Sequence, residues 1–195
     1  MVARGGVIAF RTDTLYGLGA DPFSRRGVQE IKRLKGRERR KPILILLSDL
    51  DQVPRFVAEP SKTFQLLAKT LWPGPLTLIG RATDAVPYEI TARTQTVGVR
   101  LPDDDNVRAL VRACGGALTA TSANPARKEP ARSAQEVFRY FGHAVDLIVD
   151  GGPARSLQPS TVVKVCKDKP RLIRDGLISW TNIRAAIDCY REDQS

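Results

Sequence analysis

The sequence predicts an α+β domain in which a mixed β-sheet is flanked by helices. Its 195 residues suffice for one domain with a core of its own, which we place at residues 1–190, followed by a polar tail at 191–195. Apolar strand-like runs alternate with amphipathic runs, separated by glycine and proline at short intervals. Two connections, within residues 76–101 and 161–174, are too short for helical crossovers. They predict hairpins, so the sheet is not purely parallel.

Each expected strand is a short apolar run between polar residues, glycine or proline. Residues 42–47 are apolar on both faces, which is typical of a central strand. A loop is expected over residues 151–159. The strands, in order, cover residues 7–10, 42–47, 76–79, 97–101, 117–121, 146–149, 161–166 and 171–173.

Each expected helix carries apolar residues at helical spacing. Ser24 is a candidate cap for a helix with Val28, Ile31 and Leu34 on one face, ending near Gly36. Residues 61–71 also keep a helical register, which the following Trp-Pro-Gly-Pro run stops. The other helices are expected at residues 105–114, 134–141 and 181–190.

Composition excludes several classes of protein. The longest aliphatic run, residues 43–47, is far shorter than the ~20 residues of a membrane span. The start of the chain has no charged-then-apolar leader, so secretion is not expected. Three scattered cysteines and a single histidine, His143, argue against a disulfide framework and a histidine-rich zinc site. A reducing cytoplasm fits this pattern, and His143 is expected to be structural.

The positive charge is concentrated in one segment. The chain carries a net charge of +10, and residues 25–41 contain nine basic and two acidic residues. Such a local field suits a polyanion: a nucleotide, a phosphate or a nucleic acid. The usual phosphate-binding loops are absent, because there is no G-x-x-x-x-G-K-[ST] and residues 17–19 lack the third glycine of a dinucleotide fingerprint.

Two short motifs are candidates for binding an anion. Lys35 and Arg37 would point the same way if the chain leaves its helix extended at Gly36, with Lys41 held by the following strand. A solvated basic surface is the alternative. Ser122 and Asn124 follow a predicted strand and share one side of an extended segment. With one histidine, a Ser-His nucleophile is not credible, so these side chains are expected to donate or accept hydrogen bonds. A polar turn or a helix cap is the alternative.

Other polar residues follow the expected strands. Residues 12–19 combine hydroxyls and glycines that could line a pocket, or form only a capped turn. Arg100 and Arg174 each end a strand, where a guanidinium could clamp a carboxylate or a phosphate, or lie on the surface.

Taken together, these segments resemble the YrdC/Sua5 family of threonylcarbamoyl-AMP synthases. The resemblance covers nearly the whole chain in order, and the ordered set is more specific than any one piece. The matching segments are GGVIAFRTDTLYGLGAD (5–21), IKRLKGRERRKPILIL (31–46), LWPGPLTLI (71–79), TVGVRLP (96–102), ALTATSANPA (117–126), VDGG (149–152), PSTVVKV (159–165) and RLIRDG (171–176).

The resemblance implies a twisted mixed sheet with a concave basic groove. It also implies a reaction in which L-threonine, bicarbonate and ATP give threonylcarbamoyl-adenylate and pyrophosphate, with Mg²⁺ assisting. The product would supply the modification of the adenosine beside the anticodon in tRNA, through downstream transferase proteins. Direct contact with tRNA is left open.

The resemblance also assigns the site. The K-x-R motif of the family falls on Lys35 and Arg37, which would be catalytic, and its S-x-N motif on Ser122 and Asn124. Against ATP it places Lys35, Arg37, Lys41, Thr96, Ser122, Asn124 and Arg174. Around threonine or its carbamate it places Thr14, Arg100, Ala120 and Ser160. No metal-ligating residue is assigned.

The chain departs from the family pattern at some positions. Many members have proline where Arg11 and Glu38 stand, and some have a histidine where Leu46 stands.

Two alternative functions stay open. One is an RNA-binding protein that uses the 25–41 segment, although no aromatic residue lies between Phe23 and Phe56 to stack on bases. The other is carbamoyl transfer, as in related domains of hydrogenase-maturation proteins.

Overall fold

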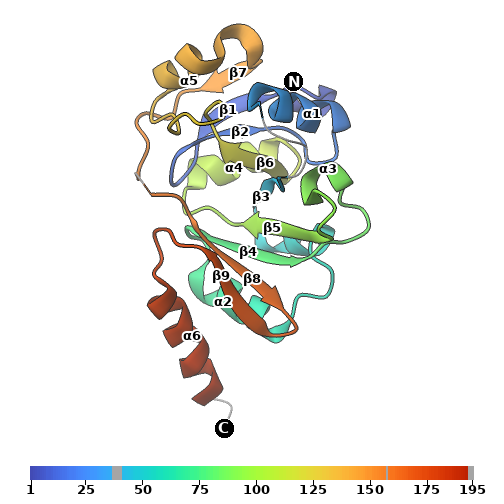
Figure 1. Cartoon of the computed structure of the whole chain (residues 1–195), viewed down its shortest axis with the longest axis vertical. Coiled ribbons are helices and arrows are strands. Elements are labelled where there is room, and N and C mark those ends of the chain that lie inside the picture. The colour runs from blue at the N-terminus through green and yellow to red at the C-terminus, as the bar shows by residue number, and fades with distance from the viewer. Residues whose placement is uncertain (37–40, 157, 193–195) are drawn as a thin grey trace.

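A computed structural model describes residues 1–36, 41–156 and 158–192 (Figure 1). One nine-stranded sheet forms the centre, in the order β7-β1-β2-β6-β3-β5-β4-β8-β9. The strands are β1 (Ile8–Arg11), β2 (Tyr16–Gly19), β3 (Leu44–Leu47), β4 (Leu76–Arg81), β5 (Thr96–Arg100), β6 (Ala117–Ser122), β7 (Leu147–Val149), β8 (Thr161–Cys166) and β9 (Lys169–Arg174). The α-helices are α1 (Arg25–Leu34), α2 (Lys62–Leu71), α3 (Tyr88–Thr91), α4 (Asp105–Ala113), α5 (Ala134–Phe141) and α6 (Trp180–Glu192), with 3-10 turns at Val2–Arg4, Leu50–Arg55 and Gly142–Ala144.

The sheet is mixed, as predicted. β3 pairs with β5, β4 with β8, and β1 with β7 in parallel, and the remaining neighbours are antiparallel. Both expected hairpins are confirmed, because β4 lies antiparallel to β5 and β8 antiparallel to β9. The connection between β4 and β5 also contains the short helix α3, which the sequence did not indicate.

The start of α1 follows the capping residue predicted from the sequence. The Ser24 hydroxyl accepts a hydrogen bond from the Gly27 amide at 3.2 Å, which satisfies one of the free amides at the start of α1. Ser61 caps α2 in the same way, through the Phe64 amide. Gly36 has a φ of +56°, the left-handed conformation that commonly ends a helix.

Residues 16–19, expected to be a turn or a pocket wall, form strand β2. This strand was not predicted because it contains two glycines, and glycine is unfavourable in strands. Packing explains the glycine at position 19: a Cβ atom there would lie 2.7 Å from the Phe10 ring and 2.9 Å from the Thr119 carbonyl oxygen. The chain therefore needs glycine where β2 passes between its neighbours.

Apolar side chains cover both faces of the sheet. Ile8 and Phe10 of β1 and Leu46 of β3 pack with α4 on one face, in the smaller core cluster. The alternate residues of the same strands belong to the larger cluster, with residues of α1 and α2. Leu118 and Ala120 of β6 belong to the smaller cluster as well. None of the helices that the structure describes is both long enough and apolar enough to span a membrane.

Leu78 tests the packing of the larger core cluster. Its side chain is fully buried in β4. We expect Leu78→Ala to lower the free energy of unfolding by about 2–5 kcal/mol, because the substitution leaves a cavity in the core. Leu50→Ala, at a half-exposed position, is the control and should change it by less than about 0.5 kcal/mol. Urea denaturation followed by circular dichroism measures both, and equal losses would contradict the assigned core.

Candidate active site

A cavity of about 260 Å³ lies on the sheet face beside α4. Strand residues two apart contribute to it together, such as Gly98 with Arg100 and Ala120 with Ser122, because alternate side chains of a strand share a face. The lining comprises Thr12, Thr14, Leu15, Tyr16, Gly17, Pro42, Ile43, Leu44, Thr77, Ile79, Gly98, Arg100, Ala120, Thr121, Ser122, Pro159, Ser160, Val162 and Arg174.

Arg100, at the end of β5, is buried against an acidic partner. Its Nη2 donates to Asp13 Oδ1 at 2.7 Å, and the two side chains are only 3% and 5% exposed. Burial lowers the pKa of Arg100, and the Asp13 charge opposes this shift. The guanidinium still stays charged at neutral pH, because arginine is not deprotonated in proteins. Its Nε is buried without a hydrogen-bond partner. Of the two alternatives for Arg100, a surface arginine is therefore wrong.

Arg174, at the end of β9, organises the opposite wall. It donates to the Ser160 carbonyl oxygen at 2.7 Å and to the Ser160 hydroxyl at 3.1 Å. That hydroxyl lies 2.9 Å from the Thr77 hydroxyl. Burial lowers the pKa of Arg174, and the charge of Arg100 lowers it further. These two arginines are the charged residues among the described lining, so the cavity favours an anion.

The turn between β1 and β2 supplies a hydroxyl wall. Thr12 Oγ1 lies 3.0 Å from Thr14 Oγ1, accepts from the Thr14 amide at 3.1 Å and donates to the Leu15 carbonyl at 2.8 Å. These bonds hold both hydroxyls at the cavity. Of residues 12–19, five line the cavity, so the pocket interpretation is confirmed and the alternative of a capped turn alone is wrong.

Lys35 reaches the S-x-N motif directly. Its Nζ donates to the Asn124 carbonyl and Oδ1 oxygens, both at 3.0 Å, and to the Ser122 hydroxyl at 3.3 Å, and it also contacts the Ser122 carbonyl oxygen. The side chain is almost completely buried. The extended conformation expected at Lys35 is wrong, since its φ of −79° and ψ of −9° are helical. The ammonium therefore lies behind Ser122, which lines the cavity.

Six of the predicted site residues share the cavity, and Lys35 and Asn124 both contact one of them, Ser122. Lys41 is exposed and is not among the lining residues. Thr96 shares a face of β5 with Gly98 and Arg100, but lies outside the cavity, beside Thr94. Arg37 lies outside the described residues. The six that share the cavity are Thr14, Arg100, Ala120, Ser122, Ser160 and Arg174.

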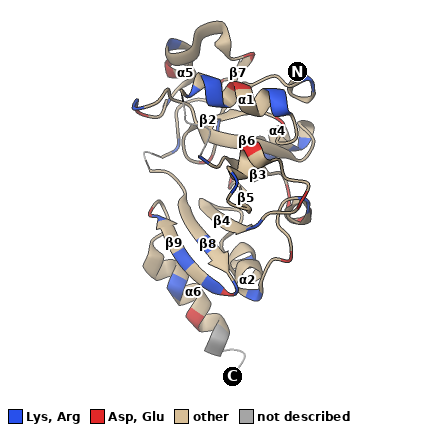
Figure 2. Cartoon of the chain, turned by 45° about the vertical axis from the view of Figure 1, so that its right-hand side comes forward, with Lys and Arg blue, Asp and Glu red and all other residues tan. Residues whose placement is uncertain are grey.

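The basic residues of α1 are not among the residues that line the cavity. Arg25 pairs with Glu89 at 2.8 Å and Arg33 with Glu30 at 2.6 Å. Figure 2 shows lysines and arginines on α1 and along β9. For Arg25 and Arg33 the structure favours the solvated-surface interpretation. The concave basic groove stays a prediction.

Sequence reasoning assigned no role to Asp13 or Thr77, although both lie in the quoted segments. Asp13 is separated from Arg100 by 87 residues, and Thr77 from Ser160 by 83. A buried arginine needs a carboxylate as its ion-pair partner, but the sequence alone does not identify which Asp or Glu provides it.

The sequence and the fold of this chain match those of a known family. The family described as Telomere recombination (Sua5/YciO/YrdC) matches residues 1–176. A protein of Marinobacter nauticus named threonylcarbamoyl-AMP synthase is 38% identical over 166 residues, which are 84% of this chain and 87% of that protein. The chain belongs to the Sua5/YciO/YrdC family.

Solved structures agree with this assignment. Pyrococcus abyssi Sua5, complexed with L-threonine, superposes with a TM-score of 0.92 at 33% identity over 95% of this chain. The chain spans about half of that protein, 55% of its length. Escherichia coli YciO superposes with a TM-score of 0.82 at 27% identity, over 93% of this chain and 88% of YciO.

Lys35→Met tests whether the ammonium holds the Ser122–Asn124 segment. The substitution keeps most of the side-chain volume but leaves buried oxygen acceptors without their charged donor. We expect the free energy of unfolding to fall by about 1–3 kcal/mol. Lys69→Met, at an exposed position of α2, is the matched control and should have little effect. Urea denaturation compares the two, and an unchanged stability of the Lys35 variant would contradict the contacts described above.

Proposed function

We propose that this chain synthesises L-threonylcarbamoyladenylate from L-threonine, bicarbonate and ATP and releases pyrophosphate. The observation that carries the proposal is the membership of the chain in a family whose relatives bear the name threonylcarbamoyl-AMP synthase, at 38% identity over most of both chains. A cavity with two arginines and several hydroxyls suits anionic substrates. The activity is that of a nucleotidyltransferase, and the product supplies the modification of tRNA adenosine next to the anticodon.

The reaction needs positioned donors and no covalent nucleophile. The threonine amine attacks the carbon of bicarbonate, a C–N bond forms, and water leaves to give the carbamate. A carbamate oxygen then attacks the α-phosphorus of ATP, and the bond to the β-phosphate oxygen breaks with release of pyrophosphate. The protein accelerates these steps by holding the reactants together and by stabilising the charge that develops on phosphate.

Threonine occupies the end of the cavity near Arg100 in this proposal. Thr14, Ala120 and Ser160 surround it, as the family resemblance implies. Arg100 binds its carboxylate, since a guanidinium offers a planar fork of donors to a planar anion. Asp13 already accepts a hydrogen bond from Nη2 of Arg100 and so fixes the orientation of the guanidinium. Ser160 is itself held by Arg174 and Thr77.

ATP occupies the part of the cavity beside Ser122 and Arg174. Both line the cavity, and Lys35 holds Ser122 from behind. We extend this site to Asn124, Lys41, Thr96 and, from the sequence alone, Arg37. Within the described residues no group of three or more His, Cys, Asp or Glu is placed to bind a metal ion. Mg²⁺ fits the site as Mg·ATP, because it retains phosphate and water ligands.

The wider setting is part of the same proposal. We assign the catalytic domain to residues 1–190 and, from the sequence alone, a polar tail to 191–195, although α6 extends through residues 191 and 192 of that range. The adenylate passes to threonylcarbamoyl-transferase proteins, with tRNA as its final acceptor. We place the reaction in the cytoplasm, where Cys114, Cys166 and Cys189, all free thiols, stay reduced. Neither RNA binding as the main activity nor carbamoyl transfer is favoured, because the relatives carry the synthase name.

Pyrophosphate release tests the proposed function. The purified chain is incubated with Mg·ATP, with or without L-threonine and bicarbonate, and with carbamoyl phosphate in place of both. We expect pyrophosphate only when threonine and bicarbonate are both present. Release that depends on carbamoyl phosphate, or no release under any condition, would contradict the proposal.

Arg37→Ala and the double variant Ser122→Ala/Asn124→Ala test the ATP end of the site. Each removes donors to the charge that develops at phosphate, so we expect kcat to fall about a hundred- to thousandfold. Arg139→Gln, an exposed residue of α5, is the control and should keep the original rate. Near-normal adenylate formation by folded Arg37→Ala protein would remove Arg37 from the site.

A further inference from the structure

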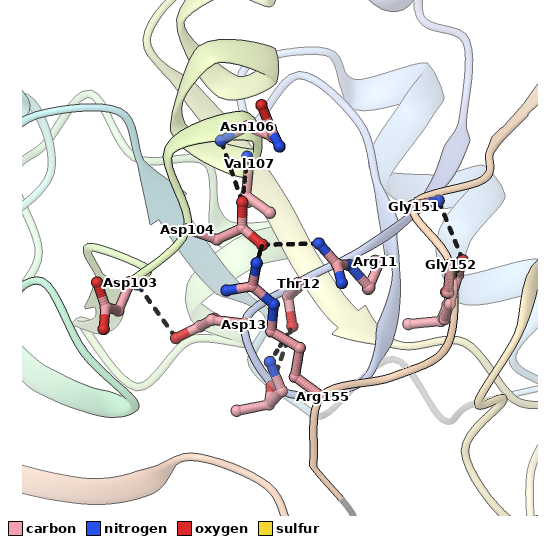
Figure 3. A network of polar contacts seen from close by, with 12 residues as sticks. Arg11, Thr12, Asp13, Asp103, Asp104, Asn106, Val107, Gly151, Gly152 and Arg155 are labelled. Carbon is pink, nitrogen blue, oxygen red and sulfur yellow. Dashed lines mark hydrogen bonds and ion pairs between the residues drawn. The ribbon is translucent and has the colours of Figure 1, made fainter.

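A buried carboxylate beside the cavity has two arginine partners. Asp104 Oδ1 accepts from the Asn106 and Val107 amides at 3.0 and 3.2 Å and so caps α4 (Figure 3). Its Oδ2 contacts Arg11 Nη2 at 2.9 Å and Arg155 Nη2 at 3.3 Å. The Asp104 side chain is 1% exposed. One negative charge thus faces two guanidinium groups and the positive end of a helix. The cluster carries a surplus of positive charge.

The two arginines are held unequally. Arg11 is 15% exposed and lies against Gly151, where a Cβ atom would be 3.1 Å from the Arg11 Cβ. Arg155 is 49% exposed, and its contact with Asp104 is the longer one. A half-exposed ion pair adds little stability. If Arg155 moves away, Arg11 and the start of α4 still neutralise Asp104, whereas the loss of Arg11 would disturb a packed contact.

Arg155 lies on the segment that borders the cavity wall. This segment joins β7 to β8, and the amide of Ser156 donates to the Thr14 carbonyl oxygen at 3.2 Å. Residues 159 and 160 of the same segment line the cavity. On the other side, the Asp103 amide donates to Asp13 Oδ2 at 3.3 Å, which joins the Arg11–Asp104–Arg155 cluster to the Asp13–Arg100 pair. Arg155 therefore stands one residue from a contact with the hydroxyl wall.

We propose that Arg155 is a further substrate-binding residue, which leaves Asp104 and binds an oxyanion of the amino-acid substrate, its carboxylate or the carbamate, at the Thr14 wall. The inference rests on the proposed function. Arg100 shares its guanidinium with Asp13, and Arg174 is assigned to ATP in the proposed function. A second anionic group on the amino-acid substrate therefore needs a further cation. Arg155 supplies it at small cost, because Asp104 retains its remaining partners.

This inference also gives a role to Arg11, at which many family members have proline. Arg11 keeps the buried Asp104 charge paired when Arg155 departs. In this proposal the Arg11–Asp104 pair stays in place, and the Arg155 side chain moves. Gly151 leaves the space that the Arg11 side chain needs.

Two variants separate substrate binding from a purely structural ion pair. Arg155→Gln removes the movable cation, and we expect the KM for threonine to rise at least about tenfold, the usual effect of losing a charged hydrogen bond. The double variant Arg11→Gln/Asp104→Asn replaces the buried ion pair with neutral amides, and asparagine still caps α4. It frees Arg155, so the KM for threonine should fall, by about two- to fivefold.

Steady-state pyrophosphate release over varied threonine, bicarbonate and ATP gives the three KM values, with thermal unfolding measured alongside. Arg139→Gln is the control for loss of an exposed arginine. Both changes break the Arg155–Asp104 contact, so a purely structural pair moves the two KM values in the same direction and overturns the proposal. An effect on the KM for ATP alone also overturns it. If the unchanged protein releases no pyrophosphate, the proposed function fails first.

Discussion

The cavity depends on a buried positive charge that requires a partner. Arg100 ends β5 and Asp13 lies in the turn between β1 and β2, on strands that β6 and β3 separate in the sheet. Removing either charge would leave the other buried and unpaired, which is strongly destabilising. The pair therefore ties the turn between β1 and β2 to the end of β5, across the two strands that lie between them. Lys35 likewise ties the end of α1 to the end of β6, through its contacts with Ser122 and Asn124.

Local patterns were sufficient to predict most elements. The strand at Thr161–Cys166 and the helix at Ala134–Phe141 have the bounds that their apolar periodicity indicated, since few glycines interrupt them. The strand at Tyr16–Gly19 was missed because it contains two glycines, of which Gly19 packs closely against Phe10. The pairing of Lys35 with Asn124 was also missed, because helical backbone continues through Lys35 and directs its ammonium inward.

The candidate site shows where sequence reasoning stops. The family resemblance supplied six residues that the structure gathers in one cavity, including Thr14, Ser122 and Arg174. It did not supply Asp13 or Arg155, because their partners lie far away in the chain and charge alone does not select among 21 acidic residues. The roles of Asp13 and Arg155 were assigned from the contacts that their side chains make in the folded structure. The roles of Lys41 and Thr96 stay predictions.

The path of the chain from β7 to β8 limits how its length can vary. β7 is at one edge of the sheet and β8 is next to the other, seven inter-strand spacings away, or roughly 34 Å in a flat sheet. The twelve residue steps from 149 to 161 reach at most about 40–43 Å when fully extended. The connection is therefore only slightly longer than the distance it must span. Deletions here would strain the crossover, whereas insertions would only loosen it, so relatives should vary this connection toward greater length.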